Sequence, residues 1–221
     1  MKPRVVAFVP LKRDSERVRG KNLCLLGGRP LYEYIFQTLA RVPEIDGIFA
    51  FASDPVFKKH LPSKVKFLTR SRALDSPSIK GLHIYREFCA AVSADFYILA
   101  HATSPFLDPG SIRTSLRKVL SGRYDSALSV RPVRTFAWFQ NRPLNYSPSD
   151  ILRTQQLQPV VLETNGFFIF KRGLMAKGRR VGSRPYFHAL SALEALDVDT
   201  PEDFKIARCL LPLYKSGKTH A

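Results

Sequence analysis

Strand-like and helix-like segments alternate along most of this chain of 221 residues, and this alternation limits the possible folds more than any other feature. Apolar runs with the composition of strands cover residues 5–9, 45–52, 65–68, 96–100, 126–133 and 160–170. Segments with helical character separate them at residues 30–42, 55–61, 79–94 and 108–120, and another follows residue 200. Such alternation predicts an α/β fold, a three-layer α/β/α sandwich with a mainly parallel sheet.

Several segments carry more specific signals. Residues 96–100, FYILA, form a nearly continuous apolar run, which is typical of a strand covered by helices on both faces of a sheet. Asp108 is expected to cap the helix that starts at Pro109, and Thr200 the helix that runs from Pro201 to about residue 214. A short extended segment is expected at residues 194–198.

The length suits a single domain over residues 1–221. Residues 134–158 differ from the rest because they are rich in aromatic residues, proline and asparagine and have no clear period. We expect an excursion from the core that serves as a lid or an oligomer contact, the alternative being an ordinary packed subdomain.

The balance of charge is strongly basic. The chain has 35 Lys and Arg against 18 Asp and Glu, a formal net charge of +17. This sign favours anionic partners, namely nucleotides, acidic sugars, nucleic acid or an anionic membrane surface. Because the basic residues are spread along the chain, we do not expect a dedicated nucleic-acid-binding arm.

Three cysteines, Cys24, Cys89 and Cys209, lie far apart, without the spacing of a metal site or a disulfide framework. We expect them to be buried thiols in a reducing cytosol. The N-terminal apolar run is too short for a signal peptide, and no apolar stretch approaches the roughly 20 residues of a membrane span. These features predict a cytoplasmic protein that does not enter the membrane.

Residues 5–22, VVAFVPLKRDSERVRGKN, combine an apolar strand, expected to end at Pro10, with a cationic loop. The cations of this loop are Lys12, Arg13, Arg17, Arg19 and Lys21. Ligands of α/β sheets gather at the carboxyl ends of strands, so the loop is a candidate site for phosphates. The alternative is a solvated basic turn.

Asp197-Val198-Asp199 is a second candidate feature. Carboxylates at positions i and i+2 of an extended segment point to the same side, so both can face one hard cation such as Mg²⁺. Alternatively, Asp199 supports the start of the following helix while Asp197 is solvated.

Polar residues elsewhere could complete such a site. His101 and Thr103 follow the strand at 96–100, where an imidazole and a hydroxyl suit contacts to a base, a ribose or a substrate. A structural histidine is the alternative. Arg153, Gln155 and Asn165 could offer guanidinium and amide donors to a carboxylated sugar.

The order of these features resembles that of the acylneuraminate cytidylyltransferase family, which comprises the CMP-sialic acid synthetases and their relatives for other nonulosonic acids. VPLKRDSERVRGKNL is similar to the family's N-terminal nucleotide loop, HATSPF to its Q-P-T-S-P-L segment and RTQQLQP to its R-x-Q-D-L-P segment. TNGFFIF and ALDVDTPEDF are similar to E-N-G-A-I-Y-I and I-D-V-D-T-P-E-D. The resemblance spans nearly the whole chain.

The resemblance implies a Rossmann-like sheet of the nucleotide-diphospho-sugar transferase type and a homodimer to which the excursion contributes. It implies transfer of CMP from CTP to an acidic sugar, with Mg²⁺ as cofactor and release of pyrophosphate. Matched residue by residue, the nucleotide contacts would be Leu11, Lys12, Ser15, Lys21, Asn22, Arg70, Ser78, His101 and Thr103. Gln155 and Asn165 would face the sugar, Asp197 and Asp199 would bind Mg²⁺, and Lys12, Lys21 and Asp199 would act in catalysis.

The chain departs from the family at several of these positions. Lys12 stands where the family has arginine, Arg13 and Asp14 where it has glycines, Glu16 where it has lysine and His101 where it has glutamine. The changes fit a divergent branch with a different acid sugar or with another acceptor, such as a small phosphonate. Two further alternatives are a nucleotidyltransferase that uses another base and a non-catalytic nucleotide- or nucleic-acid-binding homologue.

Overall fold

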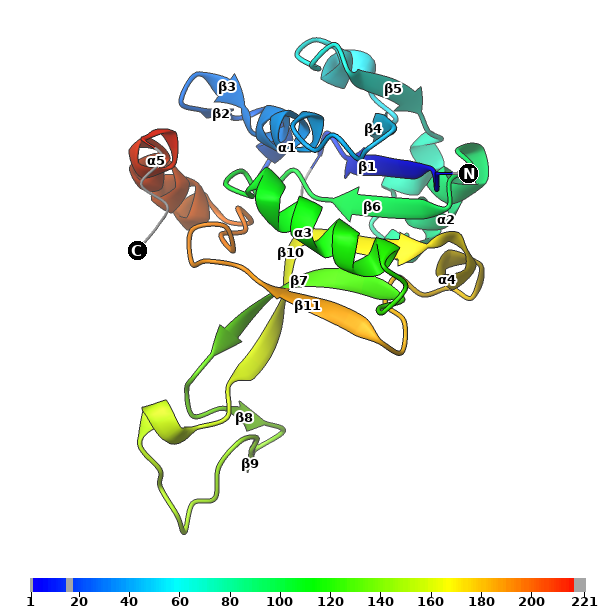
Figure 1. Ribbon diagram of the computed structural model, residues 1–221. Helices are drawn as coiled ribbons and strands as arrows, with labels where there is room; N and C mark the ends of the chain where they lie inside the picture. The colour runs from blue at the N-terminus through cyan, green and yellow to red at the C-terminus, as the bar shows by residue number, and fades with distance from the viewer. Residues whose placement is uncertain (1, 15–17, 217–221) are drawn as a thin grey trace.

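The structure is a computed structural model that describes residues 2–14 and 18–216. Its main sheet has the order β11-β7-β10-β6-β1-β4-β5 (Figure 1). In that order the strands are Pro185–Ala189, Ser126–Val133, Val160–Lys171, Phe96–Ala100, Val5–Leu11, Gly47–Ala52 and Val65–Thr69. Neighbouring strands are parallel except where β10 pairs antiparallel with β6 and with β7. The expected mainly parallel sheet is confirmed.

Helices cover both faces of this sheet (Figure 1). The helices are α1 (Leu31–Ala40), α2 (Gly81–Ala91), α3 (Pro109–Leu120), α4 (Arg172–Ala176) and α5 (Pro201–Lys215). Side chains of β1 alternate between two cores: Ala7 and Val9 pack with α1 and α3, whereas Phe8 packs with residues of α2 and α4. Because both faces are covered, the central strands β1, β4 and β6 are apolar throughout, and the three-layer α/β/α sandwich is confirmed.

A third core holds α5 against the small hairpin formed by β2 (Leu25–Leu26) and β3 (Arg29–Pro30). Gly27 in its turn has a φ of 57°, and a Cβ there would lie 2.2 Å from Leu211 Cδ2. The glycine therefore serves both the turn and the close approach of α5. The start of α5 lies beside the loop that follows β1, since Lys21 of that loop bonds to Asp199, two residues before the helix.

The signals for the starts of two helices are confirmed. The Asp108 side chain accepts from the Gly110 amide at the start of α3. At α5, Thr200 and Asp203 form a reciprocal capping box, with Pro201 in the first turn.

Two expectations about strands were wrong, and one strand was not expected at all. β1 continues through Pro10 to Leu11, because only β4 pairs with the strand beyond Phe8, and a proline is tolerated where one side is unpaired. Residues 192–195 form a turn, since the Glu194 carboxylate accepts from Ser111 Oγ at 2.6 Å and ties this segment to α3. β11, an edge strand with mixed burial, carried too weak an apolar pattern to be expected.

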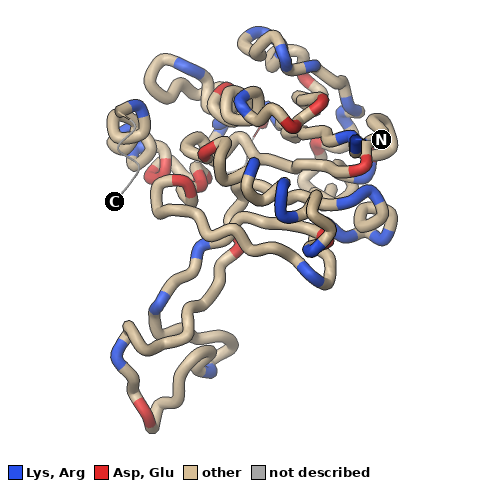
Figure 2. The backbone as a smooth tube through the Cα atoms, viewed as in Figure 1, with Lys and Arg blue, Asp and Glu red and all other residues tan. Residues whose placement is uncertain are grey.

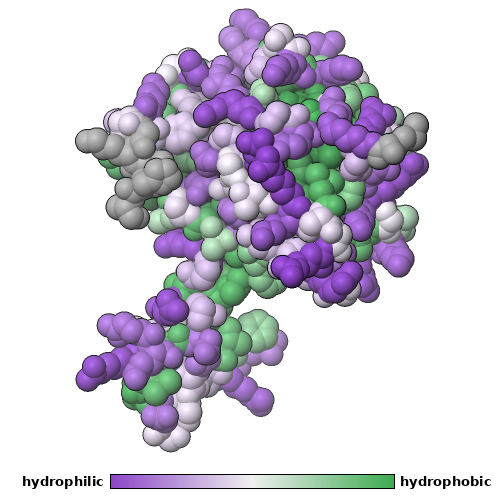
Figure 3. Space-filling view, in the orientation of Figure 1, coloured by the Kyte–Doolittle hydropathy of each residue, from purple (hydrophilic) through white to green (hydrophobic). Residues whose placement is uncertain are grey.

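Residues 134–158 lie on an arm that leaves the sheet where β7 and β10 extend beyond their neighbours (Figure 1). The arm carries the short strands β8 (Trp138–Phe139) and β9 (Arg142–Pro143) and the 3₁₀ helix η4 (Thr154–Gln156). In Figure 3 it projects as a separate lobe. Trp138 and Phe139 are 60% and 63% exposed, so the arm presents aromatic surface rather than burying it.

The cysteines differ from the expected burial. Cys89 is buried, and burial raises the pKa of its thiol to about 12. Cys24 is half-buried and Cys209 is exposed on α5, so the prediction of buried thiols is right only for Cys89. Within residues 2–14 and 18–216, no helix has the length and apolar character needed to cross a bilayer.

Candidate active site

The carboxyl ends of β1, β4 and β6 lie at the same edge of the sheet because these strands are parallel. The cationic loop after Leu11 and the His101–Pro105 segment therefore start side by side. β10 runs in the opposite direction, so its first half, which includes Asn165, reaches the same edge. The fold collects most of the expected site residues there.

An ion pair joins the cationic loop to the segment before α5. Lys21, in the 3₁₀ helix η1 (Lys21–Leu23), places its Nζ 2.6 Å from Asp199 Oδ1 across 178 positions of sequence. The Lys21 side chain is 8% exposed and that of Asp199 is 25% exposed. A lysine this buried is rare without a partner, so the pair links the two halves of the candidate site.

Two further contacts shape the cationic loop. Asn22 Nδ2 donates to the Lys12 carbonyl at 2.8 Å, which ties the two ends of the loop together. Arg13 pairs with Asp54 at 2.9 Å, so it anchors the loop to the end of β4 instead of being merely solvated. The half-buried Lys12 side chain has no ion-pair partner within the described ranges, and Ser15 lies outside them.

Arg70 is a second buried cation at this edge. Its side chain is 1% exposed, and Nη2 donates to the Leu11 carbonyl at 2.9 Å and to Asp75 Oδ1 at 2.5 Å. Its Nε and Nη1 are buried without a hydrogen-bond partner. Burial lowers the pKa of Arg70, although Asp75 opposes the shift. Buried donors without partners are costly, so a ligand that accepts from them would relieve that cost.

A chain of hydrogen bonds connects His101, Asn165 and Asp197. His101 Nδ1 donates to the Asn165 carbonyl at 2.7 Å, and Asn165 Nδ2 donates to Asp197 Oδ2 at 2.7 Å. The Val198 amide donates to the Thr103 carbonyl at 2.8 Å. Backbone and side-chain hydrogen bonds thus join the loop after β6 to the segment before α5. They bring together four expected site residues, His101, Thr103, Asn165 and Asp197.

His101 is neutral in this setting. Burial lowers the pKa of its imidazole, and the nearby Arg180 guanidinium acts in the same direction, while the Asn165 carbonyl, Asp197 and Asp199 act in the opposite direction. Because Nδ1 donates to a carbonyl, the neutral ring carries its lone pair on Nε2. That nitrogen lies 3.5 Å from the Tyr85 hydroxyl.

A bulge in β10 places Asn165. The register of β10 against β7 shifts between Glu163 and Phe168, and such a bulge re-aims the side chains near it. The buried Ser129 hydroxyl accepts from the Phe167 amide at 3.0 Å and from Thr164 Oγ1 at 2.7 Å. At Gly166, a Cβ would lie 2.9 Å from that hydroxyl, so the glycine lets the bulge close.

The two aspartates have donor chemistry suited to a hard cation. Asp197 Oδ1 is buried without a hydrogen-bond partner, and Asp199 faces the same region through its pair with Lys21. No group of three or more His, Cys, Asp or Glu able to hold a metal occurs among the described residues. Two carboxylates still fit Mg²⁺, because this ion commonly takes one or two carboxylates and completes its shell with water and phosphate oxygens.

Two expected residues are not drawn into this group. Ser78 is exposed beside Ser76, and Gln155 is exposed on the arm. Conversely, Tyr85 and Arg180 border His101 but were not anticipated from the sequence. Tyr85 belonged to an ordinary amphipathic pattern, and Arg180 lies in an irregular segment, so neither carried a local signal.

A mainly parallel α/β sheet with a cationic first loop facing a pair of aspartates defines a protein of the α/β nucleotidyltransferase class. The chain belongs to the cytidylyltransferase family, whose sequence model matches residues 6–210. The resemblance drawn from the motifs is confirmed at that level.

Two relatives show how far the similarity extends. The chain is 23% identical over 217 residues to N-acylneuraminate cytidylyltransferase of Oncorhynchus mykiss, covering 93% of this chain and 50% of that protein. It is 21% identical over 176 residues to 3-deoxy-manno-octulosonate cytidylyltransferase 2 of Hydrogenovibrio crunogenus, covering 78% of this chain and 66% of that protein. The chain therefore spans only about half to two thirds of the length of these relatives.

Solved structures share the fold. A CMP:2-keto-3-deoxy-manno-octonic acid synthetase complexed with CTP superposes with a TM-score of 0.73 at 16% identity, over 95% of this chain and 99% of that one. The 4-diphosphocytidyl-2C-methyl-D-erythritol synthase of Anaerococcus prevotii gives 0.71 at 12% identity, over 96% and 97%. At these identities the likeness concerns the architecture of the sheet and its helices.

Proposed function

We propose that this protein transfers CMP from CTP to an acidic sugar of the nonulosonic acid type, with release of pyrophosphate and with Mg²⁺ bound at Asp197 and Asp199. The Lys21–Asp199 pair carries the proposal. It joins the two features that the reaction needs, a cationic loop for a triphosphate and carboxylates for a metal. Family membership supports the choice of CTP.

The proposed reaction is an attack by the anomeric hydroxyl oxygen of the sugar on the α-phosphorus of CTP. A new P–O bond forms there, the bond to the bridging oxygen of the β-phosphate breaks, pyrophosphate leaves, and the hydroxyl proton passes to solvent. Lys12 and Lys21 would offset the charge that develops on the phosphates. Arg70, with two N–H groups that lack partners, would donate hydrogen bonds to the nucleotide.

Mg²⁺ would be held by Asp197 and Asp199 and would supply neutralisation of phosphate charge. Asn165 keeps Asp197 in place through its Nδ2, and the Asp203 carboxylate accepts from the Asp199 amide at 3.0 Å. Both aspartates are therefore oriented by neighbours that are themselves fixed by secondary structure. Preorganisation of this kind is what catalysis by positioning requires.

The acceptor class rests on the relatives, which are named for N-acylneuraminate and 3-deoxy-manno-octulosonate. Both names denote acidic sugars. A basic protein with net charge +17 suits substrates that are all anionic. The substitution of His101 for the family's usual glutamine is consistent with an acceptor that differs from those two.

The test is pyrophosphate release from CTP and Mg²⁺ with a panel of nonulosonic acids. Asp199→Asn should lower the rate by about 10²- to 10³-fold, because it removes one charge from the metal site and the partner of buried Lys21. Glu202→Gln is the matched control, since Glu202 is an exposed carboxylate three positions along the same segment. It should retain the wild-type rate.

Calorimetric titration with CTP, UTP, ATP and GTP measures base preference, and CTP should bind most tightly. Wild-type protein that neither binds CTP nor releases pyrophosphate with any acid would contradict the proposal. Tight binding of a different nucleotide would assign the protein to another nucleotidyltransferase activity. Binding to DNA or RNA that weakens steeply with salt, without turnover, would instead support the non-catalytic alternative.

A further inference from the structure

Arg180 lies between α4 and β11, outside every motif that suggested the function. Its guanidinium carbon is 3.8 Å from the centroid of the Phe168 ring. Its Nη2 donates to Glu163 Oε2 at 3.0 Å. Stacking and this ion pair hold the planar guanidinium in one orientation, which a flexible surface arginine lacks.

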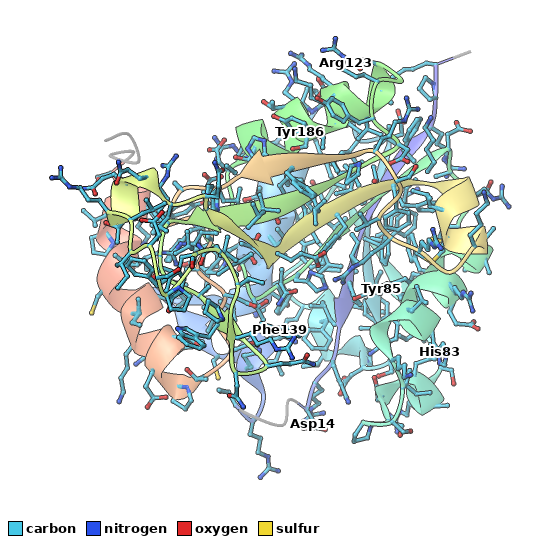
Figure 4. The ribbon with its side chains drawn as sticks, turned by 90° about the horizontal axis from the view of Figure 1, so that it is seen from below. Asp14, His83, Tyr85, Arg123, Phe139 and Tyr186 are labelled. Atoms are coloured by element: carbon cyan, nitrogen blue, oxygen red, sulfur yellow. The ribbon has the colours of Figure 1, made fainter. Side chains whose placement is uncertain are left out.

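The surroundings of Arg180 belong to the candidate active site. Phe168 presents its face to Arg180, and the His101 ring meets Phe168 edge to face with centroids 6.3 Å apart. Burial raises the pKa of the Tyr85 hydroxyl, and the nearby Arg180 guanidinium opposes that shift. Figure 4 shows Tyr85 on the inner side of α2, in contrast to His83 on the outer side. Arg180 thus borders the wall formed by Tyr85 and His101.

This wall adjoins the metal and phosphate side of the site. His101 bonds to the Asn165 carbonyl, and the Asn165 amide bonds to Asp197. Arg180 and the aspartate pair therefore flank the same short stretch of β10. An acceptor placed beside the aspartates would meet Arg180 on its other side.

On the basis of the proposed function, we infer that Arg180 binds the acid group of the acceptor and makes the site specific for acidic over neutral sugars. Neutral His101 and Tyr85 bring hydrogen-bonding groups to this wall but no charge. The Arg180 side chain is 33% exposed, so an incoming carboxylate can reach it. Its planar fork of N–H donors matches a carboxylate in two parallel hydrogen bonds.

The existing partner of Arg180 does not account for its placement. Glu163 is 54% exposed, and an ion pair with so exposed a carboxylate contributes little to stability. Such a partner can be displaced or shared when a stronger anion arrives. Glu163 positions the guanidinium and leaves it available to the acceptor.

The experiment compares Arg180→Gln with Arg179→Gln, which removes an adjacent and exposed arginine. The readouts are KM for whichever nonulosonic acid of the panel the wild type uses best, with N-acetylneuraminate and 3-deoxy-manno-octulosonate included in the panel, together with calorimetric Kd for CTP. Arg180→Gln should raise the acceptor KM by about 10- to 100-fold, the loss expected for a charge-assisted hydrogen-bonded pair. Kd for CTP should stay within about twofold, and Arg179→Gln should match wild type.

A neutral acceptor separates recognition from a structural role. Wild-type protein should prefer the acid that it uses best to the methyl ester of that acid, whereas Arg180→Gln should lose most of that preference. Arg180→Lys keeps the charge without the planar fork, so its preference for the acid should lie between those of wild type and Arg180→Gln. This variant also keeps the test valid if Arg180→Gln fails to fold.

Two results would overturn the inference while leaving the proposed function intact. One is an unchanged acceptor KM in Arg180→Gln, and the other is an equal preference for acid over ester in wild type and variants. A wild-type protein that uses no acid at all would instead contradict the proposed function, and the role of Arg180 would fall with it.

Discussion

Lys21 and Arg70 are both buried, and both lie at the edge of the sheet where the first loop begins. Burying a cation costs free energy unless partners compensate it. Lys21 has Asp199 within 2.6 Å, but Arg70 keeps two nitrogens without partners. A fold that tolerates this arrangement holds positive charge ready for an anionic ligand, and this supports the proposed triphosphate site.

His101 provides a prediction about pH. Its pKa in the folded protein lies below the ordinary 6.5 because burial disfavours the imidazolium. The unfolded chain therefore binds more protons below pH 6.5, so stability is complete above that pH and is lost as the pH falls. His101→Gln should weaken this pH dependence. The measurement is the free energy of unfolding in urea between about pH 5 and 8, the range in which an imidazole titrates.

Two other histidines serve as a comparison and a control for that measurement. Burial also lowers the pKa of His188, so some pH dependence should remain in His101→Gln. The exposed His83 on α2 supplies the control, since His83→Gln should keep the wild-type profile. Identical profiles for His101→Gln and His83→Gln would show that His101 does not titrate abnormally.

Among the elements, β10 contributes most to the site because it runs against the other strands and carries a bulge. Regular pairing would turn successive side chains to alternate faces without a break. The bulge instead leaves Asn165 able to bond through its carbonyl to His101 and through its amide to Asp197. The element's irregularity is therefore part of the proposed function.

Ser129→Ala should test the bulge. The change leaves the buried Phe167 amide without the hydroxyl that it donates to at 3.0 Å. We expect a loss of about 1–3 kcal/mol in the free energy of unfolding, measured in urea, and a lower rate of pyrophosphate release. Ser121→Ala, an exposed serine after α3, should change the stability by less than about 0.5 kcal/mol. Equal stability of the two variants would show that the hydroxyl does not hold the bulge.

At the scale of the whole molecule, the cations of the chain are spread over the body and the arm (Figure 2). A net charge of +17 spread in this way favours anionic ligands in general. The arm is the other large-scale feature. Its exposed aromatic surface is of the kind that marks a protein contact, and we propose that it joins two copies of the chain.

Light scattering tests this proposal. Wild type should have twice the 25.0 kDa mass of one chain. The double variant Trp138→Ser, Phe139→Ser should shift toward the monomer, because it removes two aromatic side chains that are more than half exposed. Ile206→Ser, a change of an exposed apolar residue on α5, should leave the mass unchanged. A monomeric wild type would contradict the proposal.

Local signals in the sequence predicted much of the fold. The apolar runs at 96–100 and 126–133 coincide with β6 and β7, and the caps of α3 and α5 form at the expected residues. These features depend on periodicity and on side chains bonding to nearby backbone, which act within a few residues. β11 and the 192–195 turn were missed because their geometry depends on distant partners, β7 and α3.

Local sequence patterns were enough to predict the alternation of strands and helices and the layers of the sandwich, and the motifs supplied the charged residues proposed for the site. Three contacts could be seen only in the folded chain: Lys21 meets Asp199, Asn165 lies between His101 and Asp197, and Arg180 stacks on Phe168. The reason is that local signals act over only a few residues, whereas these contacts join distant parts of the chain. Strand order and the packing of α5 on the β2–β3 hairpin bring together hydrogen-bonded residues that are between 32 and 178 positions apart, and no local pattern encodes that approach.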